Sequence, residues 1–314
     1  MNPALSVIAF TTLSGAGYGL MIWLGILLPF HRQPPLPPQF GWVAMVLALV
    51  LVSAGLLASL AHLGHPERAW RALSQWRTSW LSREGIAAVW CFVPALGVLA
   101  VLLGYAPITW LSWLGPLLSV SALVTVLCTA MIYASLKTVP QWRDWRVLPL
   151  YALFALASGA VLLLPVLNWA APDLALNMPS TTAQAALLIA FALRYWQRRH
   201  WRDLDATPSL AAAIGLPGAG EARVFEGAHT EASFITREMV FRFARKHADA
   251  MFFTALLLGA AFAGGLLELA SNQGGGIRIG FALAAVCAYA GIFLERWLFF
   301  AEARHVVSTY FERR

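Results

Sequence analysis

The chain has 314 residues, of which 60% are hydrophobic and 12% are charged, and its net charge is +7. An ordinary soluble domain carries about 25% charged residues, so this composition excludes a water-soluble globule, a disordered chain and a disulfide scaffold. The 14 Trp and 18 Phe residues suit the aromatic belts of a membrane protein. We therefore predict an all-α integral membrane protein whose residues 1–314 form a single membrane domain.

Eight segments have the length and apolar character of membrane spans, for which about 20 residues are needed. In chain order they are Leu5–Phe30, Gly41–His62, Glu84–Leu103, Leu114–Leu136, Leu148–Trp169, Pro179–Trp196, Asp249–Ala270 and Ile277–Phe300. The first segment carries Gly15 and Gly19, a spacing that favours close contact with another helix. It lacks a basic region in front of it, so we expect a retained helix and not a signal peptide. The sequence thus predicts a bundle of eight transmembrane helices.

The basic residues predict the orientation of this bundle. With eight spans, both termini and the connections after spans two, four and six lie on one side of the membrane. That side holds all of the 22 Lys and Arg residues except Arg32 and Arg278. Because basic residues accumulate on the cytoplasmic side, we expect both termini to be cytoplasmic in a bacterial inner membrane.

The longest cytoplasmic connection covers residues 197–247. Its second half, HTEASFITREMVFRFARKH, has the pattern of a basic amphipathic helix that runs towards span seven. Two interpretations stay open: a helix that lies on anionic lipid, and a docking surface for a soluble partner. The basic side chains concerned are Arg237, Arg242, Arg245 and Lys246.

Several kinds of site are not expected within this chain. The three cysteines lie singly in apolar runs, and without a paired spacing they predict neither an Fe–S cluster nor a metal site. The seven His residues fall at helix ends or in loops, which argues against paired haem ligands inside the membrane. Glu295 lies near the end of the last span, where it faces either a headgroup or another helix. A transporter is disfavoured because we find no inverted repeat.

The segment HLGHPERAWRALSQWRTSWLSREG joins spans two and three and is the most polar stretch beside the membrane. His62 ends span two and Glu84 begins span three, and a short surface helix over Glu67–Gln75 is expected between them. An imidazole and a carboxyl group at the membrane edge suit the proton exchange that quinone redox chemistry needs. Tyr133 is expected at the same edge. The alternative is that both groups are only solvated helix ends.

Two patterns in this segment, HLGHP and SWLSRE, resemble the DmsC-type membrane anchors of the dimethyl sulfoxide reductase family, within the wider NrfD-like group. The resemblance covers most of the chain. It implies an anchor without haem or Fe–S clusters of its own, which exchanges electrons between membrane quinone and a ferredoxin-like Fe–S subunit. That subunit in turn serves a molybdopterin catalytic subunit. A purely structural anchor is the alternative.

The resemblance also implies roles for particular residues. His62 and Glu84 match the quinone-site His and Glu of the family. Quinone-binding roles are carried to neighbouring side chains by proximity: Trp80, Ser82, Arg83 and Tyr133. The arginines of the same loop are expected to meet the Fe–S subunit: Arg68, Arg71 and Arg77.

The predicted orientation places this loop in the cytoplasm, whereas exported dimethyl sulfoxide reductases work outside it. In this respect the chain is similar to the anchors of cytoplasm-facing sulfite dehydrogenase complexes, which the stretches TTLSGAGYG and HTEASFITREM also resemble. The resemblance therefore favours sulfite oxidation coupled to quinone reduction. Quinol oxidation by a reductase complex is the alternative, and the partners' potentials set the direction.

Overall fold

The computed structural model describes residues 4–30, 36–61, 63–203, 210–215, 222, 243–272 and 278–310. Its long elements are the helices α1 (Leu5–Phe30), α2 (Pro38–Leu60), α3 (Trp80–Leu102), α4 (Leu111–Ala134), α5 (Val147–Ala170), α6 (Asn177–Asp203), α9 (Phe243–Leu256), α10 (Ala263–Asn272) and α11 (Arg278–Ala301). A π-helical segment, η3 (Leu257–Phe262), joins α9 to α10. Four short elements complete the set: η1 (Pro66–Gln75), η2 (Ile108–Trp110), α7 (Leu210–Ala213) and η4 (Val306–Tyr310). The predicted all-helical bundle is confirmed over this part of the chain.

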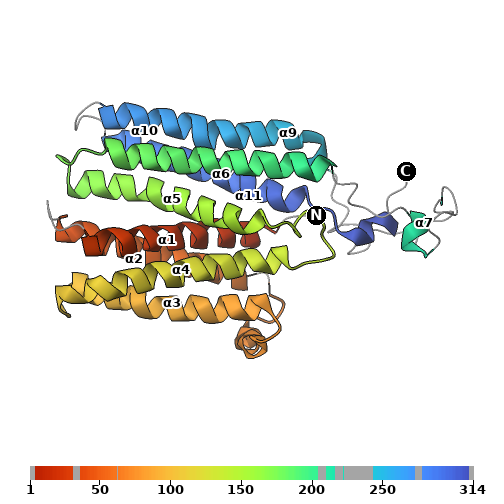
Figure 1. Ribbon diagram of the computed structural model, residues 1–314, viewed down its shortest axis with the longest axis horizontal. Coiled ribbons are helices and arrows are strands. Elements are labelled where there is room, and N and C mark those ends of the chain that lie inside the picture. Colours follow the sequence, from red (N-terminus) through yellow and green to blue (C-terminus); the bar gives the residue numbers. More distant parts are fainter. Residues whose placement is uncertain are drawn as a thin grey trace.

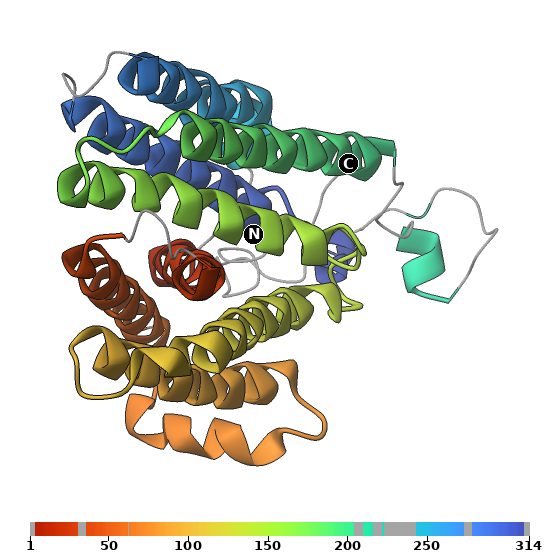
Figure 2. The ribbon, with the colours of Figure 1, turned by 60° about the vertical axis from the view of Figure 1, so that its left-hand side comes forward.

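The central helix of the bundle is α1, which packs against α2, α4 and α5. Figure 2 shows it between a group formed by α2, α3 and α4 and a second group formed by α5, α6, α9, α10 and α11. Small residues allow these close contacts: the Gly19 backbone meets Ala155 and Gly159 of α5, and Gly17 meets Ala48 of α2. The apolar faces of α1 and α5 are the most buried among the apolar spans.

Seven helices of the described residues are long and apolar enough to cross a membrane. The predicted span Pro179–Trp196 is not among them, although α6 packs alongside α5 and α10 in the bundle. Its polar first turns and the arginines near its C-terminal end, Arg194, Arg198, Arg199 and Arg202, lower its hydropathy. The prediction that this segment spans the membrane therefore stays a prediction.

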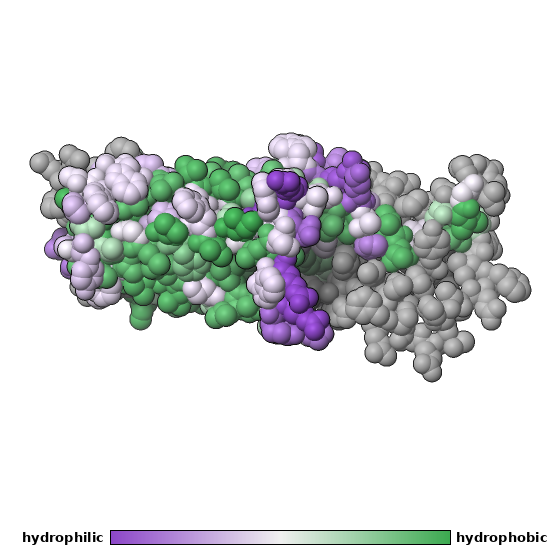
Figure 3. Space-filling model, turned by 90° about the horizontal axis from the view of Figure 1, so that it is seen from below, coloured by the Kyte–Doolittle hydropathy of each residue, from purple (hydrophilic) through white to green (hydrophobic). Residues whose placement is uncertain are grey.

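The two ends of the bundle differ in polarity. A strongly hydrophilic band follows the apolar belt at one end of the molecule, while the other end is only weakly polar (Figure 3). The helix α1 begins and α11 ends at the hydrophilic end, where α3 and α5 also begin (Figure 1). The structure thus brings most of the predicted basic connections together.

The surface helix expected over Glu67–Gln75 is present as η1, a 3-10 helix and not an α-helix. It is seen end-on in Figure 1, so it runs across the long axis of the bundle. Trp70 is exposed on it, and Trp76 is exposed directly after it. The predicted amphipathic helix over residues 229–247 lies largely outside the described residues. The described chain continues at Phe243, where α9 begins.

Candidate quinone site and a buried Arg–Glu cluster

Glu84 lies in the second turn of α3 and is only 5% exposed. It is buried because it shares one helix face with Ala88, Cys91 and Ala95, and this face packs inside the bundle. Its Oε1 atom has no hydrogen-bond partner among the described residues. Such a buried acceptor costs free energy unless a ligand, a proton or water satisfies it. Glu84 is therefore built into the bundle and is not a solvated helix end.

Hydroxyl-bearing residues of two neighbouring helices lie near the Glu84 carboxyl group. Thr129 of α4 is one of them, and its Oγ1 donates a hydrogen bond to the Thr125 carbonyl oxygen at 3.1 Å. The charge of Glu84 also influences Tyr18 of α1. The buried Tyr18 hydroxyl group has no hydrogen-bond partner among the described residues. Ser82 is fully buried two residues earlier on α3, and its Oγ atom also has no partner in the described part. The carboxyl group thus sits in a polar niche with unused hydrogen-bonding capacity.

Tyr133 is placed near this niche by an aromatic cluster at the end of α4. Its ring stacks on Tyr151 with a centroid distance of 5.8 Å and meets the edges of Trp142 and Phe300. Glu84 is one of the ionisable groups whose charge influences the Tyr133 hydroxyl group. The structure therefore brings Tyr133, Ser82 and Glu84 to the same region of the bundle.

Arg83 turns away from the Glu84 carboxyl group. Its Nε donates a hydrogen bond to the carbonyl oxygen of Trp76 at 2.9 Å, and its Nη2 donates one to that of Arg77 at 2.7 Å. Its guanidinium carbon lies 4.2 Å from the centre of the Trp80 ring, a cation–π distance. Arg83 and Trp80 therefore fasten the end of η1 to the start of α3. They flank the niche at the surface of the bundle.

The remaining predicted site residues are distributed as follows. Arg68, Arg71 and Arg77 are exposed on and beside η1, and Lys246 is exposed at the start of α9. His62, Arg237 and Arg242 lie outside the described residues, as does the side chain of Arg245. The exposed set gives the hydrophilic end of the bundle a positive surface.

A buried Arg–Glu cluster, which the sequence analysis did not identify, joins α6 to α11. It consists of Arg194, Arg198, Glu295, Arg296 and Glu302. Arg194 Nε donates to Glu295 Oε1 at 2.7 Å, and Arg296 Nε donates to Glu295 Oε2 at 2.6 Å. Glu302 accepts hydrogen bonds from Arg194 and Arg198. Arg194 and Glu295 are both fully buried.

Aromatic rings cover the Arg–Glu cluster. The Arg194 guanidinium carbon lies 4.4 Å from the centre of the Trp201 ring, and that of Arg296 lies 4.6 Å from the Tyr151 ring. The signal available in the sequence was Glu295 beside Arg296 inside a span, because charged pairs within membrane helices are rare and tend to be functional. Of the two predicted positions for Glu295, the structure shows that it faces another helix.

The segment after α11 folds back onto the connection between α4 and α5. The Val306 amide donates to the Thr138 carbonyl oxygen at 2.9 Å, and the Arg304 amide donates to Gln141 Oε1 at 3.2 Å. Partial burial lowers the pKa of His305, whose Nδ1 accepts a hydrogen bond from the Val307 amide.

In the described ranges, no three His, Cys, Asp or Glu side chains gather as metal ligands.

Comparison with known proteins assigns the chain to a family. It is 33% identical to a sulfite dehydrogenase subunit of Allochromatium vinosum over an alignment of 342 residues, which covers 99% of both chains. The family profile described as the DMSO reductase anchor subunit (DmsC) matches residues 1–301. Together with the helical bundle and its apolar belt, these matches show that the chain belongs to the DmsC family of membrane anchor subunits.

Proposed function

We propose that this membrane anchor transfers electrons between an Fe–S partner subunit and the membrane quinone pool, without a haem or Fe–S cluster of its own. The observation that carries the proposal is the buried Glu84 carboxyl group. Its Oε1 atom accepts no hydrogen bond from the described residues, and it lies close to the surface loop that precedes α3. A structural anchor needs no such group, because a buried carboxyl group without full hydrogen bonding destabilises the fold. A quinone site needs one, because quinone reduction consumes two protons.

The residues around Glu84 suit the two polar ends of a quinone headgroup. Glu84 exchanges protons, together with His62 at the end of the preceding span. Ser82 and Tyr133 offer hydroxyl groups on the buried side of the niche. Trp80 and Arg83 flank it at the surface, where the cation–π contact holds them together. These six residues form the proposed quinone site.

The positive surface beside this site suits an electron-donating partner. Arg68, Arg71 and Arg77 are exposed within the loop that leads to Glu84, and complementary charge would hold an acidic Fe–S subunit in register. The basic residues Arg237, Arg242, Arg245 and Lys246 are assigned to the same docking role. We place this surface, both termini and the partner subunits on the cytoplasmic side of a bacterial inner membrane.

The similarity to a sulfite dehydrogenase subunit favours sulfite oxidation by a molybdopterin subunit, with electrons passing to quinone. The match to the DMSO reductase anchor family supports the opposite direction, in which quinol is oxidised. The assembled complex distinguishes them: sulfite-dependent reduction of a water-soluble quinone analogue supports the first direction, and sulfoxide-dependent quinol oxidation supports the second.

The proposed site is tested by Glu84→Gln in the assembled complex, with Glu67→Gln as the matched control. Glu67 carries the same group on the loop that precedes α3, but its side chain is 62% exposed. Because the amide cannot exchange the proton, we expect Glu84→Gln to lower quinone-coupled turnover by about 10²-fold or more. Glu67→Gln should leave turnover unchanged. Reduction of the partner's clusters by substrate should be normal in both.

If Glu84→Gln turned over quinone as fast as the control, Glu84 would have no part in quinone chemistry. The alternative of a purely structural anchor would then stand. Retention of the partner subunits is measured in the same preparations by co-purification, so that a loss of assembly is not mistaken for a loss of proton exchange.

A further inference from the structure

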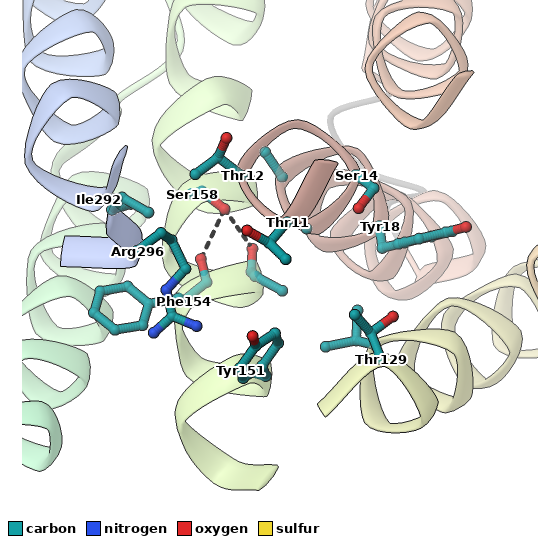
Figure 4. A pocket seen from close by; sticks show the side chains of 14 residues that line it. Thr11, Thr12, Ser14, Tyr18, Thr129, Tyr151, Phe154, Ser158, Ile292 and Arg296 are labelled. Atoms are coloured by element: carbon teal, nitrogen blue, oxygen red, sulfur yellow. Dashed lines mark hydrogen bonds between the residues drawn. The ribbon is translucent and has the colours of Figure 1, made fainter. Parts of the chain in front are cut away.

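A pocket inside the bundle lies between α1, α4, α5 and α11 (Figure 4). Its wall includes side chains from each of these helices: Thr11, Tyr18, Thr129, Tyr151, Ser158 and Arg296. A pocket with this many hydroxyl groups and a guanidinium group is unusual in a membrane bundle, where buried polar groups are costly and tend to be functional.

Arg296 supplies a free hydrogen-bond donor to the pocket. Glu295 holds its Nε, and the guanidinium lies over the Tyr151 ring. Arg296 is only 2% exposed, and its Nη2 atom has no partner among the described residues. Figure 4 shows the guanidinium and Tyr151 on one side of the pocket, facing Thr11 of α1. The ion pair with Glu295 thus positions a charged donor at the pocket wall.

The opposite side of the pocket leads to the proposed quinone site. Tyr18 and Thr129 lie there (Figure 4), and both are neighbours of the Glu84 carboxyl group. Donors and acceptors without partners in the described part of the chain therefore occur at both sides: Arg296 Nη2 at one, and Tyr18 Oη and Glu84 Oε1 at the other.

The size of the pocket indicates its occupant. The cavity volume is about 20 Å³, enough for one water molecule and far too small for a quinone ring. A buried water molecule makes about three hydrogen bonds to groups that otherwise lack partners. Arg296 Nη2 as donor and the surrounding hydroxyl groups supply that set.

We propose that the pocket binds a water molecule held by Arg296, and that this water and the hydroxyl groups of Tyr151, Tyr18 and Thr129, which line the same pocket, form a proton relay to Glu84. This inference rests on the proposed function. When quinone accepts two electrons from the Fe–S partner, it also takes up two protons. For each of these two protons, Glu84 delivers a proton to a quinone oxygen, and the relay returns a proton to Glu84 from bulk water that exchanges with the water in the pocket.

The relay is tested in the assembled complex by Tyr18→Phe and Thr129→Val, each of which removes one hydroxyl group and little volume. The matched controls are Tyr289→Phe, which removes another buried hydroxyl group without a described partner, and Thr125→Val, which alters a buried threonine of the same helix; neither residue lines the pocket. We expect Tyr18→Phe and Thr129→Val to lower quinone turnover about tenfold and to raise its solvent deuterium isotope effect. The quinone KM should not change, and both controls should behave like the parent complex.

Test variants indistinguishable from their controls would overturn the relay, even if Glu84→Gln abolishes turnover. If Glu84→Gln keeps full activity, the proposed function fails instead. A high-resolution density map of the complex gives a second readout. We expect one ordered water within hydrogen-bonding distance of Arg296 Nη2, whereas no density there, or density for a quinone headgroup, would overturn the assignment of a water site.

Discussion

Glu295 is the residue on which the buried charges depend. Its two carboxylate oxygens bind Arg194 and Arg296 at 2.7 and 2.6 Å, and it is fully buried. Buried ion pairs add little net stability, because desolvation offsets their attraction, but removing one partner leaves a charge that water cannot solvate. Glu295 therefore pairs with two guanidinium groups that would otherwise carry uncompensated charge inside the bundle.

This role predicts the effect of Glu295→Gln, which keeps the shape of the side chain and removes its charge. Arg194 and Arg296 would then face each other without the carboxylate between them, so we expect a loss of about 3–5 kcal/mol in the free energy of unfolding. The control is Glu268→Gln on α10, where the carboxyl group is exposed. Thermal unfolding of the complex in detergent measures both. Equal melting temperatures would show that Glu295 does not stabilise the cluster.

At the scale of single helices, α1 and α5 approach each other through glycine. A Cβ atom added at Gly19 would overlap the Ala155 carbonyl oxygen, and one added at Gly159 would overlap the backbone of Gly19. Only residues without a side chain allow two helix backbones to come this close. The contact sets the position of the central helix and therefore that of Thr11 and Tyr18.

Gly19→Ala should therefore separate α1 from α5 and destabilise the bundle, by about 1–3 kcal/mol as for other overpacked cores. Gly15→Ala is the control, because a Cβ atom there meets nothing within 4 Å. Helical signal during heating and the yield of assembled complex are the measurements. If Gly15→Ala were as harmful as Gly19→Ala, the close α1–α5 contact would not explain the effect.

The two glycines also show which features of the elements a single sequence can predict. Their spacing indicated a small-residue face on the first span, but only Gly19 makes the helix contact, because helix pairing depends on distant segments. The same reason hid the Arg–Glu cluster, since Arg194 and Glu295 are 101 residues apart. Glu84 shares its helix face with Ala88, Cys91 and Ala95, and this local pattern is visible in the sequence of α3, but its burial also requires packing against distant helices. The π-helical segment η3 gave no signal in the apolar pattern of its span.

At the scale of the whole molecule, the number of membrane spans and the side on which the basic connections lie depend on whether α6 crosses the membrane. Its hydropathy is low in part because Arg194 and Arg198 lie towards its C-terminal end, where they pair with Glu295 and Glu302 inside the bundle. The hydropathy of a helix counts such arginines as if lipid surrounded them. Here the carboxylates of Glu295 and Glu302 neutralise them. An α6 that crosses the membrane gives eight spans and places every basic connection at one end, as the positive-inside rule requires.

The crossing of α6 is tested by two single cysteine variants at exposed positions on either side of it. Met178→Cys lies at the start of α6, and Lys246→Cys lies at the start of α9. If α6 spans the membrane with the basic end inside, a membrane-impermeant maleimide added to spheroplasts should label Met178→Cys. Lys246→Cys should react only after the membrane is permeabilised, because it then lies on the cytoplasmic side. Labelling of both from the same side would mean that α6 does not cross, and the reversed pattern would place the proposed quinone site and its docking surface outside the cytoplasm.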